Sequence, residues 1–177
     1  MSVAARLCRS QAGVAAIEMA LVAPFLLALL FGSVEMGKYF MDQHVVVKAV
    51  RDGARFAARQ PMSNYRGDDA GCADVADELI AAQTRNVVRS GNPGGAGSRL
   101  TYWTDPETIT VTTSCSAIAG GEELGGIYAG AAAGDAAVGA PVVTVSVTLP
   151  YDSLFDFVPF ADALDIRAEQ QAVVTGI

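Results

Sequence analysis

The apolar and polar positions divide the chain into a hydrophobic N-terminal run and a patterned remainder. No charged side chain lies between Met19 and Val34, and with the residues before Glu18 the apolar run approaches about 20 residues, enough to span about 30 Å of hydrocarbon. Beyond this run, small or apolar residues recur at helical spacing, at Val46, Val50, Gly53 and Ala57. The pattern predicts one helix from Gly13 to about Arg59, on the order of 70 Å long.

The rest of the chain alternates between helical and strand-like patterns. A second helix is predicted over Ala73–Arg89, followed by a glycine-rich loop. Four strands are predicted, at Arg99–Thr104, Thr108–Cys115, Pro141–Leu149 and Asp165–Thr175. The last is expected to pair with residues 142–149, and the Gly/Ala-rich stretch from 116 to 141 is expected to be a surface loop. The predicted fold class is α+β, with an antiparallel sheet of about four strands.

The charge balance and the candidate chemistry narrow the function. A formal net charge of -7 argues against a nucleic-acid partner, because phosphate binding needs clustered Lys and Arg. No motif places a cysteine or serine nucleophile near the single histidine, His44, so that no catalytic triad can be assembled. The sequence also lacks the residue spacing of a zinc site. The sequence therefore predicts neither an enzyme nor a cofactor or metal site.

The basic residues before the apolar run predict its orientation. Arg6 and Arg9 precede the run, so that the positive-inside rule places the N-terminus in the cytoplasm and the bulk of the chain outside. Cys72 and Cys115 would then lie in an oxidising compartment, whereas Cys8 would not. A Cys72–Cys115 disulfide would close a loop of roughly 40 residues and contribute about 3–4 kcal/mol. The alternative is a pair of buried free thiols.

Glu18 places a carboxylate near the start of the apolar run, where inserting it into lipid costs about 2–3 kcal/mol. Small residues lie before the run, at Ala12 and Gly13, which suggests cleavage on the cytoplasmic side after Gly13. Val14 would become the N-terminus and Glu18 the fifth residue. The amine of a neighbouring subunit could then pair with Glu18 and set the axial register of stacked helices. The alternative is a carboxylate that snorkels to the interface, and the residues leave both interpretations open.

The N-terminal stretch RSQAGVAAIEMALVAPFLLALLFGSVEMG resembles class III prepilins and pseudopilins of the tight-adherence (Tad/Flp) system, and most of all the TadE-like family. The family pattern is a short basic leader, a glycine, four small or apolar residues, a glutamate and an aromatic residue. Gly13, Val14–Ala15–Ala16–Ile17 and Glu18 match, and Met19 stands where the family usually has Tyr or Phe. A second, helix-packing stretch is similar to a recurring A-A-R-E-G-A-R segment of the family. It comprises Arg51, Asp52, Gly53, Ala54 and Arg55.

The resemblance implies a pilin-like protein of a bacterial inner membrane. Residues 1–13 would be the leader, 14–34 the transmembrane segment, 35–60 the emerging part of the helix, and 61–177 a periplasmic α+β domain. It implies cleavage by a prepilin peptidase and a role as a minor pseudopilin in assembly or priming of an adhesive pilus. The implied partners are TadF-like and Flp-like pilins, an inner-membrane assembly platform and the lipid bilayer. A TadF-like assignment stays open, because both families share this N-terminus.

An alternative needs no processing. In it the chain is an uncleaved single-pass anchor whose periplasmic domain serves as a scaffold or binding module of a secretion apparatus.

Overall fold

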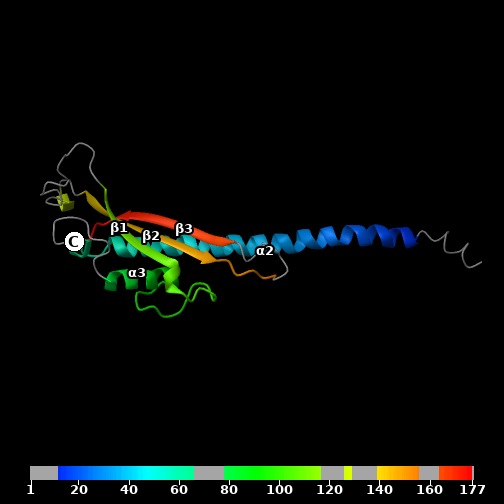
Figure 1. The fold of residues 1–177 in the computed structure, drawn as a ribbon, viewed down its shortest axis with the longest axis horizontal. Coiled ribbons are helices and arrows are strands. Elements are labelled where there is room, and N and C mark those ends of the chain that lie inside the picture. Colours follow the sequence, from blue (N-terminus) through cyan, green and yellow to red (C-terminus); the bar gives the residue numbers. More distant parts are fainter. Residues whose placement is uncertain (1–11, 66–77, 117–125, 129–138, 156–163, 177) are drawn as a thin grey trace, which may run out of the picture.

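The fold is built around one long helix that projects far beyond the remaining elements (Figure 1). The computed structural model describes residues 12–65, 78–116, 126–128, 139–155 and 164–176. Helix α2 runs over Ala12–Ala58, a length of 47 residues, and α3 over Glu78–Ser90. The strands are β1 (Ile109–Ser116), β2 (Ala140–Pro150) and β3 (Asp165–Val173). Short 3-10 helices lie at Met62–Tyr65, Pro106–Thr108 and Gly126–Tyr128.

Helix α2 has two halves with different surroundings. Its C-terminal half lies along one side of the sheet and beside α3, whereas its N-terminal half extends away from both (Figure 1). The predicted packing stripe is confirmed, since Val46, Val50 and Ala57 are at most 1% exposed and Gly53 is also buried. The helix continues through Pro24 and ends one residue before the predicted Arg59, at Ala58.

The sheet is an antiparallel meander in the order β1-β2-β3. Strand β2 is central, as predicted for residues 141–149, and β3 pairs with it as predicted, with Val147 opposite Ala168. Alternate residues of β2 face the core. These are Val143, Val145, Val147 and Leu149, which are all at most 4% exposed. The other face of the strand carries more exposed threonine and serine side chains, so that the sheet has one face on α2 and one toward solvent.

The prediction of about four strands is wrong, because the sheet of the described residues has three. The segment predicted as the first strand, Arg99–Thr104, forms turns, in which the Trp103 N–H donates to the Leu100 carbonyl at 3.0 Å. Both Leu100 and Trp103 are buried. A strand would point residues three apart to opposite faces, whereas a tight turn places both side chains in the core.

The second predicted helix is present, and its described part begins at Glu78. The predicted start at Ala73 lies outside the described residues, as does most of the predicted loop from 116 to 141. Helix α3 ends at Ser90 and is followed by Gly91, whose φ of 83° is left-handed and whose N–H donates to the Val87 carbonyl at 2.8 Å. This is the usual glycine-dependent helix ending.

Candidate functional site

The N-terminal half of α2 is the first candidate site, because it leaves a large apolar surface uncovered. Ile17, Phe25 and Leu29 are about 70% exposed, with values of 71%, 68% and 71%. Among the described residues, one helix (Gly13–Ala58) is long and apolar enough to cross a membrane, and its most apolar window is wholly unburied. Such a surface is stable in contact with lipid or with other apolar helices.

The predicted processing residues lie in the first turns of this exposed half. Gly13 and Val14 are exposed, and no atom lies within 4 Å of the position that a Gly13 Cβ would take. Glu18 is exposed and lies four residues after Val14, so that both project from one face of the helix. The structure thus places the carboxylate one turn from the amine that cleavage after Gly13 would create.

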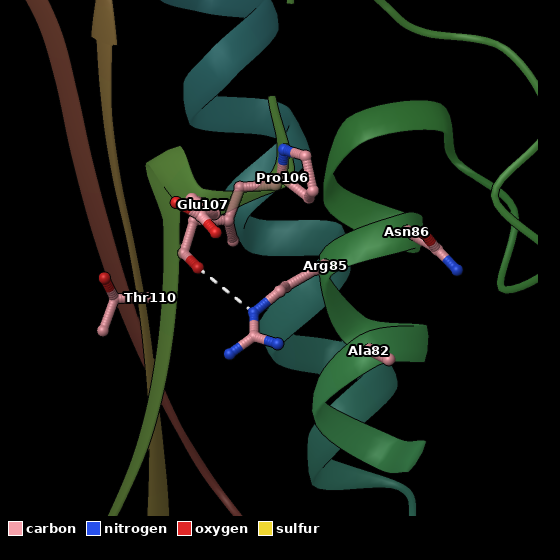
Figure 2. Close-up of a pocket in the computed structure, with 7 residues that line it drawn as sticks. Ala82, Arg85, Asn86, Pro106, Glu107 and Thr110 are labelled. Carbon is pink, nitrogen blue, oxygen red and sulfur yellow. Dashed lines mark hydrogen bonds between the residues drawn. The ribbon is translucent and has the colours of Figure 1, made fainter. Parts of the chain in front are cut away.

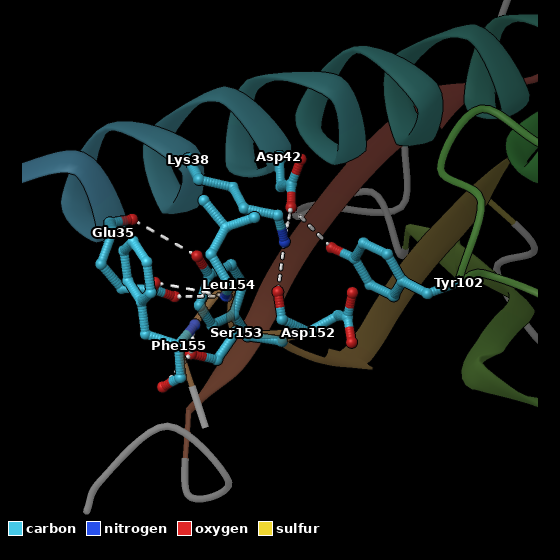
Figure 3. A network of polar contacts seen from close by, with 9 residues as sticks. Glu35, Lys38, Asp42, Tyr102, Asp152, Ser153, Leu154 and Phe155 are labelled. Carbon is cyan, nitrogen blue, oxygen red and sulfur yellow. Dashed lines mark hydrogen bonds and ion pairs between the residues drawn. The ribbon is translucent and has the colours of Figure 1, made fainter. Parts of the chain in front are cut away.

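The second candidate is a polar junction between α2 and the end of the sheet at which β2 ends and β3 begins (Figure 3). Its centre is Lys38, whose ammonium forms an ion pair with Asp42 at 3.3 Å and donates to the Asp152 carbonyl. The same Nζ lies 4.6 Å from the ring centre of Tyr151 and 5.2 Å from that of Tyr102. One cation therefore joins α2, the turn before β1 and the segment after β2.

Two tyrosines complete the junction, of which Tyr102 is half-buried and Tyr151 is buried. The Tyr102 hydroxyl donates to Asp42 Oδ2 at 2.9 Å, and Asp42 is only 8% exposed. Burial, followed by the hydrogen bond to Asp42 and its charge, raises the pKa of Tyr102 well above its usual range. Burial and the neighbouring Glu35 likewise raise the pKa of Tyr151. Deprotonation of either hydroxyl is thus even less favourable than for a tyrosine in water.

The segment after β2 is also tied to the helix directly. The Leu154 N–H donates to both carboxylate oxygens of Glu35 at 3.2 Å, and the Tyr151 hydroxyl donates to the Glu35 carbonyl at 3.3 Å. The rings of Phe31 and Phe155 meet edge to face, with centres 5.0 Å apart. The end of the sheet is thus fixed against α2 at the point where the predicted transmembrane segment ends.

The stretch 51–55 divides its residues between two roles. Gly53 and Ala54 are buried, and a Cβ added to Gly53 would lie 2.3 Å from Cγ2 of Val88, so that α2 and α3 approach closely here. Asp52 accepts a 2.9 Å ion-pair contact from Arg99, in the turns that follow α3. Arg51 and Arg55 are exposed.

Of the three cysteines and the single histidine, Cys115 and His44 lie in the described part of the chain. Cys115, near the end of β1, is disulfide-bonded, whereas Cys72 and Cys8 lie outside the described residues. The Cys72–Cys115 pairing stays a prediction. His44 is exposed on α2.

A shallow groove of about 510 Å³ lies between α3 and the start of β1 (Figure 2). Its one described internal bond runs from Arg85 Nε to the Ile109 carbonyl at 3.3 Å. The lining consists of Ala82, Arg85, Asn86, Pro106, Glu107, Ile109 and Thr110. It joins one cation, one carboxylate and one amide on an open surface, and it includes no cysteine, serine or histidine.

The polar junction was not predicted from the sequence. One signal was visible: Lys38 and Asp42 are four residues apart on a predicted helix, a spacing that favours an ion pair. The partners Tyr102 and Asp152 carry no such signal, because they lie far away in the chain and outside any motif.

Comparison with known proteins finds a similarity over the first part of the chain. No curated protein and no solved structure matches the chain. The family model of the TadE-like proteins matches residues 13–55. This stretch contains Gly13, Glu18 and the 51–55 segment, and it covers α2 from its first turn to the helix-packing residues. The resemblance to the TadE-like family is thereby confirmed over residues 13–55, about a quarter of the chain.

Proposed function

We propose that this protein is a minor pseudopilin that is cleaved after Gly13 and takes part in assembling or priming a Tad/Flp-type adhesive pilus. The observation that carries the proposal is the family match over residues 13–55, which coincides with an exposed, apolar helix beginning at Ala12. In this role the helix anchors the chain in the inner membrane, and the α3–sheet unit faces the periplasm. The globular part positions and presents the helix.

The proposed pairing at the helix start follows from charge. After cleavage, the Val14 amine and the Glu18 carboxylate share one end of an apolar rod, within one turn of each other. In lipid each charge is costly without a partner. An amine and a carboxylate from adjacent subunits would neutralise each other, and they can do so only in one axial register. The partners would be other Tad pilins and pseudopilins, of TadF-like and Flp-like types.

The N-terminal sequence and intact mass of the protein, purified from membranes of its own host, test the proposal. A chain that starts at Val14 supports prepilin-type cleavage. A chain that still carries Arg6 and Arg9 would contradict it and would favour the uncleaved single-pass anchor, with its periplasmic domain as a scaffold or binding module. A Gly13→Leu variant serves as the matched control, because it should keep the leader whatever happens to the unmodified chain.

A further inference from the structure

The segment 151–155, between β2 and the residues that precede β3, reaches toward the apolar half of α2. In Figure 1 it leaves the sheet and runs beside α2 in the direction of the helix N-terminus. Its contacts with Phe31, Glu35 and Lys38 hold it there. Its position relative to a membrane is therefore set by α2.

The depth of this segment follows from the Phe31–Phe155 contact. Phe31 lies three residues before the end of the proposed transmembrane segment 14–34, which corresponds to about 5 Å along the helix axis. The ring of Phe155 lies 5.0 Å from that of Phe31. If α2 crosses the bilayer over residues 14–34, Phe155 consequently lies at the boundary of the hydrocarbon.

The backbone of the segment is suited to this depth. Hydrocarbon offers no hydrogen-bond partners, so that a loop in contact with lipid must satisfy its polar groups internally. The Leu154 N–H donates to the Glu35 carboxylate at 3.2 Å. The Ser153 hydroxyl accepts from the Phe155 N–H at 3.2 Å and donates to the Phe155 carbonyl at 3.1 Å. Protein groups thus satisfy the N–H groups of Leu154 and Phe155 and the Phe155 carbonyl without water.

The side chains of this region are likewise suited to the membrane boundary. Leu154 is 52% exposed, and Leu164, whose carbonyl accepts from the Tyr151 N–H at 2.9 Å, is 46% exposed. Farther along α2 lies Lys38, whose ammonium lies over the rings of Tyr102 and Tyr151. A lysine and tyrosines beside exposed leucines form the arrangement that is found where protein crosses from headgroups into hydrocarbon.

We propose that segment 151–155 inserts Leu154 and Phe155 into the periplasmic edge of the bilayer, as a second membrane contact beside α2. The inference rests on the proposed membrane anchorage, but on neither cleavage nor pilus assembly. Two contacts at one level would prevent the globular part from tilting on the long helix.

Quenching of tryptophan by lipids with brominated acyl chains tests this insertion. The full-length chain is reconstituted into vesicles of phosphatidylcholine and phosphatidylglycerol, with or without bromine, as the variant Leu154→Trp. The native Trp103 is buried, and the emission of the unmodified chain gives its contribution. Leu26→Trp, exposed within the span, is the positive control, and Val173→Trp, 44% exposed at the other end of β3, is the negative control.

We expect the emission of Leu154→Trp to be quenched about as strongly as that of Leu26→Trp, with no quenching of Val173→Trp. Quenching at Leu26 without quenching at Leu154 would overturn the insertion and leave the anchorage intact. No quenching at Leu26 would overturn both. Quenching at Val173 as well would show a domain lying on the lipid without specific insertion. If Leu154→Trp does not fold, Phe155→Trp replaces it, with the same outcomes expected.

Discussion

At the scale of single residues, Gly53 shows how closely the two helices approach. The position lies inside α2, where alanine is favoured over glycine by up to about 1 kcal/mol. The added Cβ would, however, lie 2.3 Å from Cγ2 of the fully buried Val88. Overpacking in a core costs about 1–3 kcal/mol, which exceeds the gain in helix propensity. The steric effect should therefore decide the sign.

We expect Gly53→Ala to lower the free energy of unfolding by about 1–2 kcal/mol, as measured by thermal melting of the full-length chain in detergent. Gly37→Ala is the matched control, because no atom lies within 4 Å of its added Cβ, and it should be neutral or stabilising. The loss in Gly53→Ala/Val88→Ala should be smaller than the sum of the single losses. A Gly53→Ala protein as stable as Gly37→Ala would contradict the close approach.

Lys38 is the residue on which the polar junction depends. Its side chain is 22% exposed and that of Asp42 is 12% exposed, so that the ion pair is largely removed from water. Lys38→Met keeps the aliphatic contacts but removes the charge, and the buried Asp42 is then left with Tyr102. We expect a loss of about 2 kcal/mol in the free energy of unfolding, measured by the same melts.

The matched control for this variant is Lys48→Met, which changes an exposed lysine of the same helix. It should alter stability by less than about 0.5 kcal/mol. If both variants melt alike, the contacts of Lys38 with Asp42 and the tyrosine rings contribute nothing to stability.

At the scale of elements, the hydrophobic periodicity of the sequence correctly predicted which faces of α2 and β2 are buried. The stripe through Val46, Val50 and Ala57 and the alternation along β2 both reflect burial of one face, and both were read correctly. The prediction of a strand at Arg99–Thr104 was wrong, because six residues of mixed polarity do not distinguish a short strand from a turn. The three-residue spacing of its two largest apolar side chains was the signal that favoured the turn.

The sequence offers two possible disulfide partners for Cys115, which are Cys8 and Cys72. Cys115 is disulfide-bonded, and we propose Cys72 as its partner, because Cys8 would lie on the cytoplasmic side. Digestion under non-reducing conditions should give a peptide pair that contains Cys72 and Cys115 and that separates on reduction. Cys115→Ser should cost about 3–4 kcal/mol of stability, and Cys8→Ser should cost none. Alkylation of Cys72 in the unreduced chain would contradict the pairing.

At the scale of the whole molecule, the apolar helix could be predicted but its junction with the sheet could not. An uncharged run of this length has few other uses, so that the exposed half of α2 follows from composition. The bonds of Glu35 to Leu154 and of Lys38 to Asp152 connect residues more than a hundred positions apart. Such contacts depend on where the chain returns after β2, and no local pattern records that.

Helix α2 forms a rod that projects from a folded head, which we define as α3, the sheet and the polar junction. The head is fastened to α2 at one end of the apolar half, by Lys38 and the segment 151–155, whereas Glu18 lies at the other end. Changes at Glu18 are therefore separated from the folded head by the length of the exposed apolar half of α2. This separation makes assembly and folding independently testable.

We expect Glu18→Ala to lower pilus assembly without lowering membrane insertion, because an uncharged helix start enters lipid at least as readily but loses the partner of the Val14 amine. Glu18→Gln should show the same loss, since it keeps the size and removes the charge. The measurements are the amount of surface pili in the host and the fraction of protein in carbonate-washed membranes. The head should melt as in the unmodified chain, because Glu18 is exposed and far from the junction. Normal piliation in Glu18→Ala would rule out the charge pair as the device that sets the register, and loss of the protein from membranes would show that Glu18 acts earlier, in insertion.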